Sequence, residues 1–92
     1  MSFKFADQMN RSKKDPFTRL VDLNIGEKGR IKDIRGGRMA IQRLYDLGLT
    51  IGTVVAIKNK AIFGGPVELL VRGSDLALGR GIAAKIIVQR LS

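Results

Sequence analysis

The stretch GGRMAIQRLYDLGLTIGT, residues 36–53, decides the fold because it places one short amphipathic helix between two strand-forming segments. Apolar residues recur in it at helical spacing and predict a single buried face. The residues of this face are Ala40, Ile41, Leu44 and Leu47. Polar residues fall on the other side, so we expect a helix with one face against a core.

The end of this helix is marked by Gly48, which suits the left-handed position that closes many helices. With Gly48 there, Leu44 and Leu49 become the pair that touch in a Schellman motif. Gly52 permits a second bend, after which residues 53–57 have strand-forming composition.

Short strand patterns fill the rest of the chain. Strands are expected at 30–35, 53–59, 67–72, 76–78 and 86–91. In the first of these, Ile31 and Ile34 are three residues apart, which breaks strict alternation and predicts a bulge or bend. The strand at 67–72 alternates cleanly, with Val67, Leu69 and Val71 on its buried face. The expected connections are a loop at 60–65, a turn at 73–75 and a helical turn at 79–85.

Five or six short strands joined by glycine-rich turns predict a mainly β fold, a small antiparallel barrel with the short helix capping one open end. Leu44 and Leu47 would seal that end. Residues 1–16 show neither helical nor strand periodicity and are expected to form a flexible leader. The domain is expected to comprise residues 17–92.

Missing residue types exclude several kinds of chemistry. The 92 residues contain no cysteine and no histidine, which removes thiol nucleophiles, disulfides, zinc knuckles and the commonest general base. The eight carboxylates lie mostly beside turns or basic residues, as solvated surface groups do. A metal site would have only oxygen ligands, which bind ferrous iron weakly. We therefore expect no enzyme activity, no cofactor and no metal site.

The net charge of +9 favours a polyanionic partner, although such a charge also keeps small domains soluble. Binding of nucleic acid by a basic small barrel is the main alternative function. Barrels that bind single strands present aromatic side chains on their strands. None of the strands expected here contains an aromatic residue, which argues against that alternative.

The ordered set of residues along the chain resembles the FeoA family. The resemblance rests on Arg43-Leu44-Tyr45-Asp46-Leu47-Gly48-Leu49, Gly52-Thr53, Gly65-Pro66-Val67, Val71-Arg72-Gly73 and Leu76-Ala77-Leu78-Gly79-Arg80, with Leu23, Gly26, Gly29, Ile31, Ile34, Ala84, Ile86 and Val88. It covers about Leu20 to Leu91. The sequence departs from the family pattern at Ile51, where proline is common, and at Gly81-Ile82, where a polar or acidic pair is usual.

What the resemblance implies is an SH3-like barrel that serves as a small accessory of bacterial ferrous iron uptake. The implied partner is a large membrane iron transporter with a cytosolic G domain. The implied location is cytoplasmic, at the inner membrane only through that partner. A related domain follows metal-dependent repressors, so an interaction module of a repressor system is a further alternative.

Partner docking is expected to use exposed apolar residues ringed by basic ones. The residues we select are Ile62 and Phe63 on the 60–65 loop, Arg43 and Tyr45 on the helix, and Arg72 and Arg80 as rim charges. The competing interpretation has Phe63 folding back over the mouth of the barrel. A weak homo-oligomer through the same patch is also possible on these residues.

Overall fold

The structure is a computed structural model that describes residues 16–91. The expected leader, residues 1–16, lies outside the described residues except for Pro16. The strands are β1 (Phe17–Arg19), β2 (Lys28–Ile34), β3 (Val54–Lys60), β4 (Val67–Val71), β5 (Ser74–Leu78) and β6 (Ile86–Leu91). The helices are η1 (Leu20–Asp22), α2 (Arg38–Asp46), η2 (Ile62–Gly64) and α3 (Arg80–Ala83).

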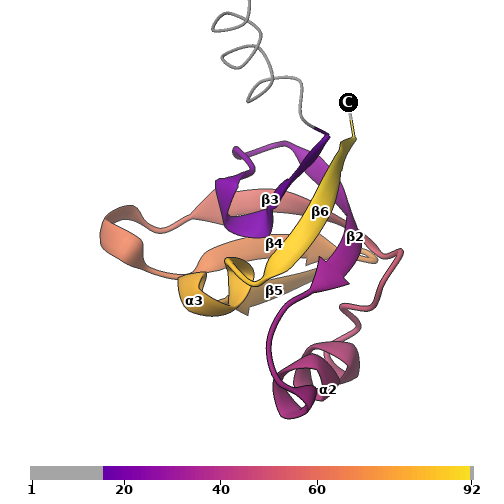
Figure 1. Cartoon of the computed structure of the whole chain (residues 1–92). Helices are drawn as coiled ribbons and strands as arrows, with labels where there is room; N and C mark the ends of the chain where they lie inside the picture. Colours follow the sequence, from indigo (N-terminus) through magenta and orange to yellow (C-terminus); the bar gives the residue numbers. More distant parts are fainter. Residues whose placement is uncertain (1–15, 92) are drawn as a thin grey trace, which may run out of the picture.

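The six strands form one antiparallel sheet in the order β1-β6-β2-β3-β4-β5. The sheet curls around a single core, with α2 beyond one end of the strands and α3 beside β5 and β6 (Figure 1). The predicted mainly β architecture of five to six strands is confirmed.

Alternation of apolar and polar residues explains how the strands face the core. Along β4, Val67, Leu69 and Val71 are buried, whereas Glu68 and Leu70 are exposed. This is the period of two that a strand with one buried face requires. The buried face of β4 is therefore the one predicted from the sequence.

The break in alternation between Ile31 and Ile34 is a β-bulge. The pairing of β2 with β6 shifts register between Ile31 and Asp33, and both isoleucines are buried as a result. A bulge inserts one extra residue, which returns the next side chain to the core face. The predicted irregularity is confirmed.

Several strand boundaries differ from the prediction by one or two residues, among them the start of β5. The β4–β5 hairpin turns at Arg72 and Gly73, with φ of 52° and 81°, rather than at 73–75. Two left-handed residues make the tight turn whose twist matches the strands, so β5 starts two residues early, at Ser74. In addition, Phe17–Arg19 pairs with β6 as strand β1, which its three residues were too few to predict.

The end of α2 has the predicted Schellman motif. The N–H of Leu49 donates to the carbonyl of Leu44 (2.9 Å), and the N–H of Gly48 donates to the carbonyl of Tyr45 (2.9 Å). Gly48 has a φ of +89°, and both Leu44 and Leu49 are buried. The helix therefore ends where the sequence places its end.

The contact of α2 with the core is narrower than predicted. Leu44 is 3% exposed and belongs to the core, and Ile41 packs against it. Leu47, by contrast, is 46% exposed. The expectation that Leu47 helps to seal the barrel is wrong, because the helix reaches the core over little more than one turn.

Candidate partner-docking site

The β3–β4 connection carries two of the three most exposed large apolar side chains among residues 16–91, the third being Met39 on α2. Ile62 is 78% exposed and Phe63 is 100% exposed. They lie in η2, at the tip of a loop that extends away from the sheet (Figure 1). The interpretation in which Phe63 folds back over the barrel is therefore wrong. We call Ile62 and Phe63 the loop tip.

Hydrogen bonds hold the base of this loop. The N–H of Ala61 donates to the carbonyl of Pro66 (3.1 Å), and Nη2 of Arg80 donates to the carbonyl of Ala61 (2.7 Å). Phe63 has a φ of 62°, which costs a non-glycine residue conformational energy. Arg80 thus fixes the base of the loop, and the chain takes a left-handed backbone at Phe63 in its tip.

The six residues selected from the sequence do not form one surface. Arg80 lies beside the loop tip, since its guanidinium bonds to Ala61. Arg43 and Tyr45 lie on α2, and Tyr45 is 40% exposed. Arg72 lies in the β4–β5 turn, where its Nη2 is 3.4 Å from Oγ1 of Thr53.

Arg72 borders a wide hollow of about 340 Å³ next to the end of α2. Asp46 and Leu47 of the helix line the same hollow, together with Asp75 and Leu76 of β5. Arg72 therefore belongs with the helix end rather than with the loop tip. The predicted rim charges Arg72 and Arg80 therefore lie on two different surfaces.

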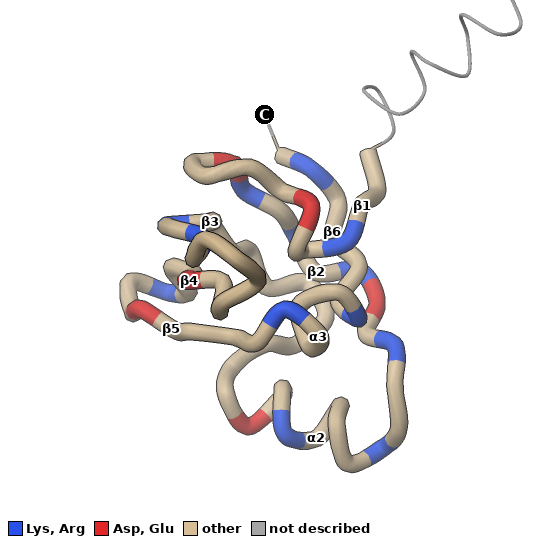
Figure 2. Tube along the Cα trace, turned by 90° about the vertical axis from the view of Figure 1, so that its left-hand side faces the viewer, with Lys and Arg blue, Asp and Glu red and all other residues tan. Residues whose placement is uncertain are grey.

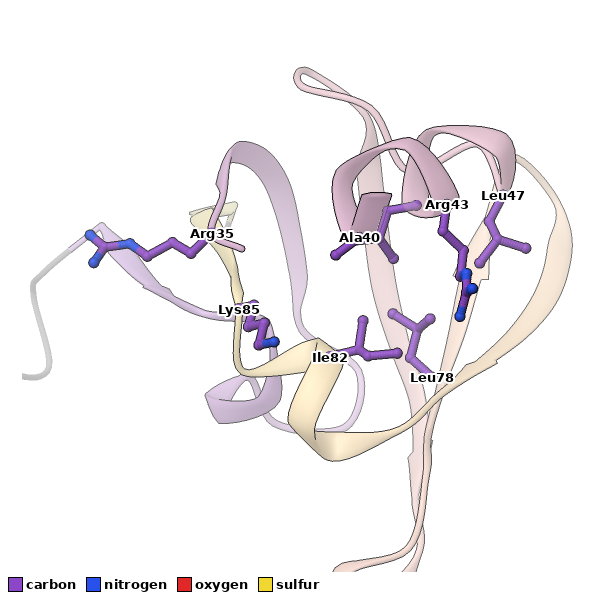
Figure 3. A pocket seen from close by; sticks show the side chains of 8 residues that line it. Arg35, Ala40, Arg43, Leu47, Leu78, Ile82 and Lys85 are labelled. Carbon is purple, nitrogen blue, oxygen red and sulfur yellow. The ribbon is translucent and has the colours of Figure 1, made fainter. Parts of the chain in front are cut away.

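Sequence reasoning missed a cleft between α2 and α3. Its lining is mainly apolar, and the side chains from the two helices face each other across it (Figure 3). The residues that line it are Arg35, Ala40, Arg43, Leu44, Leu47, Leu78, Ile82 and Lys85. Only the apolar Gly81-Ile82 pair, unusual for the family pattern, pointed to this place in the sequence.

Basic residues are spread over the molecule, with few acidic neighbours (Figure 2). Two ion pairs occur in the described part of the chain: Arg19–Asp22 (2.8 Å) and Lys58–Asp75 (2.7 Å). The hydrogen bond to Asp75 raises the pKa of Lys58 above its ordinary value, and Asp22 does the same for the pKa of Arg19. Both pairs lie in water, so their contribution to stability is small.

One aromatic side chain lies on a strand after all. Phe17 opens β1 and is 49% exposed. The expectation that no strand carries an aromatic is therefore wrong, because β1 was not predicted. The other aromatics of the described residues, Tyr45 and Phe63, lie on α2 and in η2, so they form no row on the sheet.

Across residues 16–91, no three potential metal ligands among Asp and Glu lie together as a metal site. No helix in the same range has the length and apolar character to cross a membrane. The geometry defines a class: a small SH3-like barrel domain with a projecting apolar loop and a cleft beside its helix.

The comparisons identify the family within this class. The model of the FeoA domain matches residues 18–90. The Fe(2+) transport protein A of Methanocaldococcus jannaschii is 42% identical over 65 residues, which are 70% of this chain and 76% of that protein. The chain belongs to the FeoA family, whose members are accessories of ferrous iron transport.

Solved structures agree with this assignment. A crystal structure of an iron uptake regulatory protein (FeoA) is 32% identical, with a TM-score of 0.76, over 82% of this chain and 99% of that one. The FeoA protein of Chlorobium tepidum is 28% identical, with a TM-score of 0.75, over 82% of this chain and 71% of that one. A manganese-dependent transcriptional repressor shares the fold at 18% identity and a TM-score of 0.76, over 83% of this chain and 42% of its own.

Proposed function

We propose that this protein is a non-enzymatic accessory of ferrous iron uptake that docks, from the cytosol, on a membrane iron transporter with a G domain. The loop tip, with Arg80 beside it, is the docking surface. The single observation that carries the proposal is the full exposure of Phe63 on a loop held by hydrogen bonds.

An exposed aromatic anchor is a typical source of binding energy. Burying a phenylalanine side chain contributes about 1.5–3 kcal/mol. A loop that is already ordered loses little conformational entropy when it binds. The guanidinium of Arg80 lies at Ala61 beside the loop tip. Lys60 is the last residue of β3 before this loop, and its Nζ donates to the carbonyl of Val21 (2.8 Å). These two cations favour an acidic rim on the partner.

The non-enzymatic part of the proposal is supported by the contacts of five of the six carboxylates in residues 16–91. Asp22 and Asp75 pair with basic side chains. Glu27 accepts the N–H of Asn24 (2.6 Å), Asp33 accepts that of Ile34 (2.9 Å), and Asp46 accepts the side-chain amide of Gln42 (2.9 Å). These are turn, bulge and helix contacts, which serve structure rather than acid–base catalysis.

The test is capture of the detergent-solubilised transporter by tagged Phe63→Ala and wild-type protein. We expect the variant to lose most of the captured transporter while its melting temperature is unchanged. Met39→Ala, which also truncates an exposed apolar side chain (82% exposed) but on α2, is the control and should bind as wild type.

Equal capture by all three proteins would contradict docking through the loop tip. A parallel titration with a single-stranded oligonucleotide tests the alternative. Salt-dependent binding of the oligonucleotide, lost in the Phe63→Ala variant, would favour a nucleic-acid interface instead.

A further inference from the structure

The cleft between α2 and α3 is apolar at its base and at its sides. Leu44 and Leu78, which are nearly buried, form its floor. Leu47, which directly follows α2, and Ile82 from α3 form its walls and are 46% and 40% exposed. Figure 3 shows Leu47 and Ala40 above the cavity, with Leu78 and Ile82 facing them from below. Two helices thus leave apolar side chains unpaired in water on facing walls.

The size of the cleft limits what it can hold. Its volume is about 90 Å³. Pockets for cofactors and drug-sized ligands measure about 300–1,000 Å³. A single aliphatic side chain is the largest group that the cavity can enclose. Apolar anchors of peptides fill pockets of this kind at protein interfaces.

The edge of the cleft is positively charged. Arg43 extends along it from α2, and Lys85 lies on the side of Ile82, whereas the side chain of Arg35 extends away from the cavity (Figure 3). A hydrogen bond from the N–H of Arg35 to the carbonyl of Lys85 (2.7 Å) fixes the backbone of Lys85 against β2. Neither Arg43 nor Lys85 takes part in an ion pair within residues 16–91.

Two carboxylates on flanking elements, Asp46 at the end of α2 and Asp33 in β2, make their hydrogen bonds elsewhere. Asp46 lines the neighbouring hollow and accepts a hydrogen bond from Gln42. Asp33 accepts the N–H of Ile34 in the bulge of β2. The cleft therefore combines an apolar cavity with two cations at its mouth that form no ion pair with any carboxylate of residues 16–91.

We propose that this cleft binds an acidic peptide segment of a partner protein, with one aliphatic side chain in the cavity and carboxylates at Arg43 and Lys85. Charge complementarity selects this occupant over a second copy of the chain. The loop tip, the most prominent apolar segment of a second copy, is accompanied by Lys60 and Arg80, which would meet Arg43 and Lys85 with like charge. The cleft is separate from the loop tip, so Phe63→Ala leaves it intact.

The probe is a peptide of sequence Glu-Asp-Glu-Leu-Leu-Glu-Asp-Glu, titrated into ¹⁵N-labelled full-length protein and followed by amide chemical shifts. We expect saturable shifts that centre on residues 40–47 and 78–85. A peptide with serine in place of leucine, and one with lysine in place of the acidic residues, should each bind at least about tenfold more weakly.

Matched variants locate the site. Ile82→Glu, which places a carboxylate in the wall, should weaken peptide binding by at least about tenfold. Leu70→Glu, at a side chain of similar exposure (42%) on β4, should bind as wild type. The double variant Arg43→Glu/Lys85→Glu should weaken peptide binding by a similar factor. The control double variant Lys28→Glu/Lys32→Glu lowers the net charge by the same amount and should bind the peptide as wild type does.

The proposal would be overturned if binding of the acidic peptide did not saturate at about 1 mM, or if the chemical shift changes centred on residues 60–65. It would also be overturned if the Ile82→Glu and Leu70→Glu variants bound the acidic peptide equally, or if the wild-type protein bound the lysine peptide as well as the acidic one. Dimerisation through α2 and α3, seen as concentration-dependent shifts without peptide, would also overturn it. If Ile82→Glu lowers the melting temperature, Ile82→Ser against Leu70→Ser gives the same comparison in folded proteins.

Discussion

Leu44 is the one residue of α2 whose side chain is almost fully enclosed by the core. Truncating it to alanine removes buried methyl groups and leaves a cavity. We expect Leu44→Ala to lower the free energy of unfolding by about 2–5 kcal/mol. Urea unfolding measures this loss, with Leu47→Ala as control, which should cost about 1 kcal/mol or less because Leu47 is half exposed. Equal losses in the two variants would contradict the helix contact described here.

Gly48 ends α2 with a φ of +89°, a conformation that glycine adopts without steric cost. We expect Gly48→Ala to lower the free energy of unfolding by about 1–2 kcal/mol. Gly81→Ala is the matched control, since Gly81 lies in α3 without a positive φ and with open space around it. The control should be neutral or slightly stabilising. Thermal unfolding of both variants makes the comparison, and an unaffected Gly48→Ala would refute the motif.

At the scale of single residues, local rules predicted the structure well. Gly48 and the Leu44–Leu49 pair follow from backbone sterics that act within a few residues. The exposure of Leu47 could not be predicted in this way. Leu44 and Leu47 share the same apolar stripe, and only the position of the helix on the barrel decides which of them is covered.

The β4–β5 hairpin, like the loop at Phe63, carries a conformational cost in a residue other than glycine. Arg72 occupies a left-handed position, with a φ of 52°, in the turn. Asparagine tolerates this backbone better than arginine. We expect Arg72→Asn to raise the free energy of unfolding by about 0.5–1 kcal/mol, part of the cost of left-handed backbone.

Chemical denaturation measures this gain in the free energy of unfolding. Arg72→Val should instead lower the free energy of unfolding, because a β-branched residue resists a positive φ. A stabilising Arg72→Val would contradict the turn geometry. Loss of the long contact from Arg72 to Thr53 (3.4 Å) should subtract little from the gain.

At the scale of elements, alternation predicted the existence and buried face of β4, and a broken alternation predicted the bulge of β2. The sequence did not predict β1. Three residues are too few to show a period of two, and β1 exists because β6 offers an edge with which it pairs. The turn was predicted at 73–75 and not at Arg72 and Gly73, because arginine seldom adopts a left-handed backbone.

The whole molecule has no imidazole or thiol among its 92 residues. Carboxylate oxygens alone bind ferrous iron weakly. We expect anaerobic titration of Fe²⁺ at micromolar concentration to show no tight stoichiometric binding, measured against a competing colorimetric chelator. Tight binding of one equivalent of Fe²⁺ would overturn this prediction. It would mean that several carboxylates come together in solution to hold the ion.

At the same scale, the sequence predicted one of the two candidate docking surfaces and not the other. The apolar 60–65 loop stood out by composition, and its tip is exposed. The cleft between α2 and α3 could not be anticipated, because its walls lie 35 residues apart in the sequence, at Leu47 and Ile82. Only the closure of the sheet brings them face to face.

The loop tip also offers a practical use. The chain contains no cysteine, so a thiol introduced by Phe63→Cys is unique and fully reachable. A photoactivatable crosslinker or a spin label attached there would stand on a backbone held by Arg80. Such a reporter would map the surroundings of one fixed point on any assembly that this protein joins.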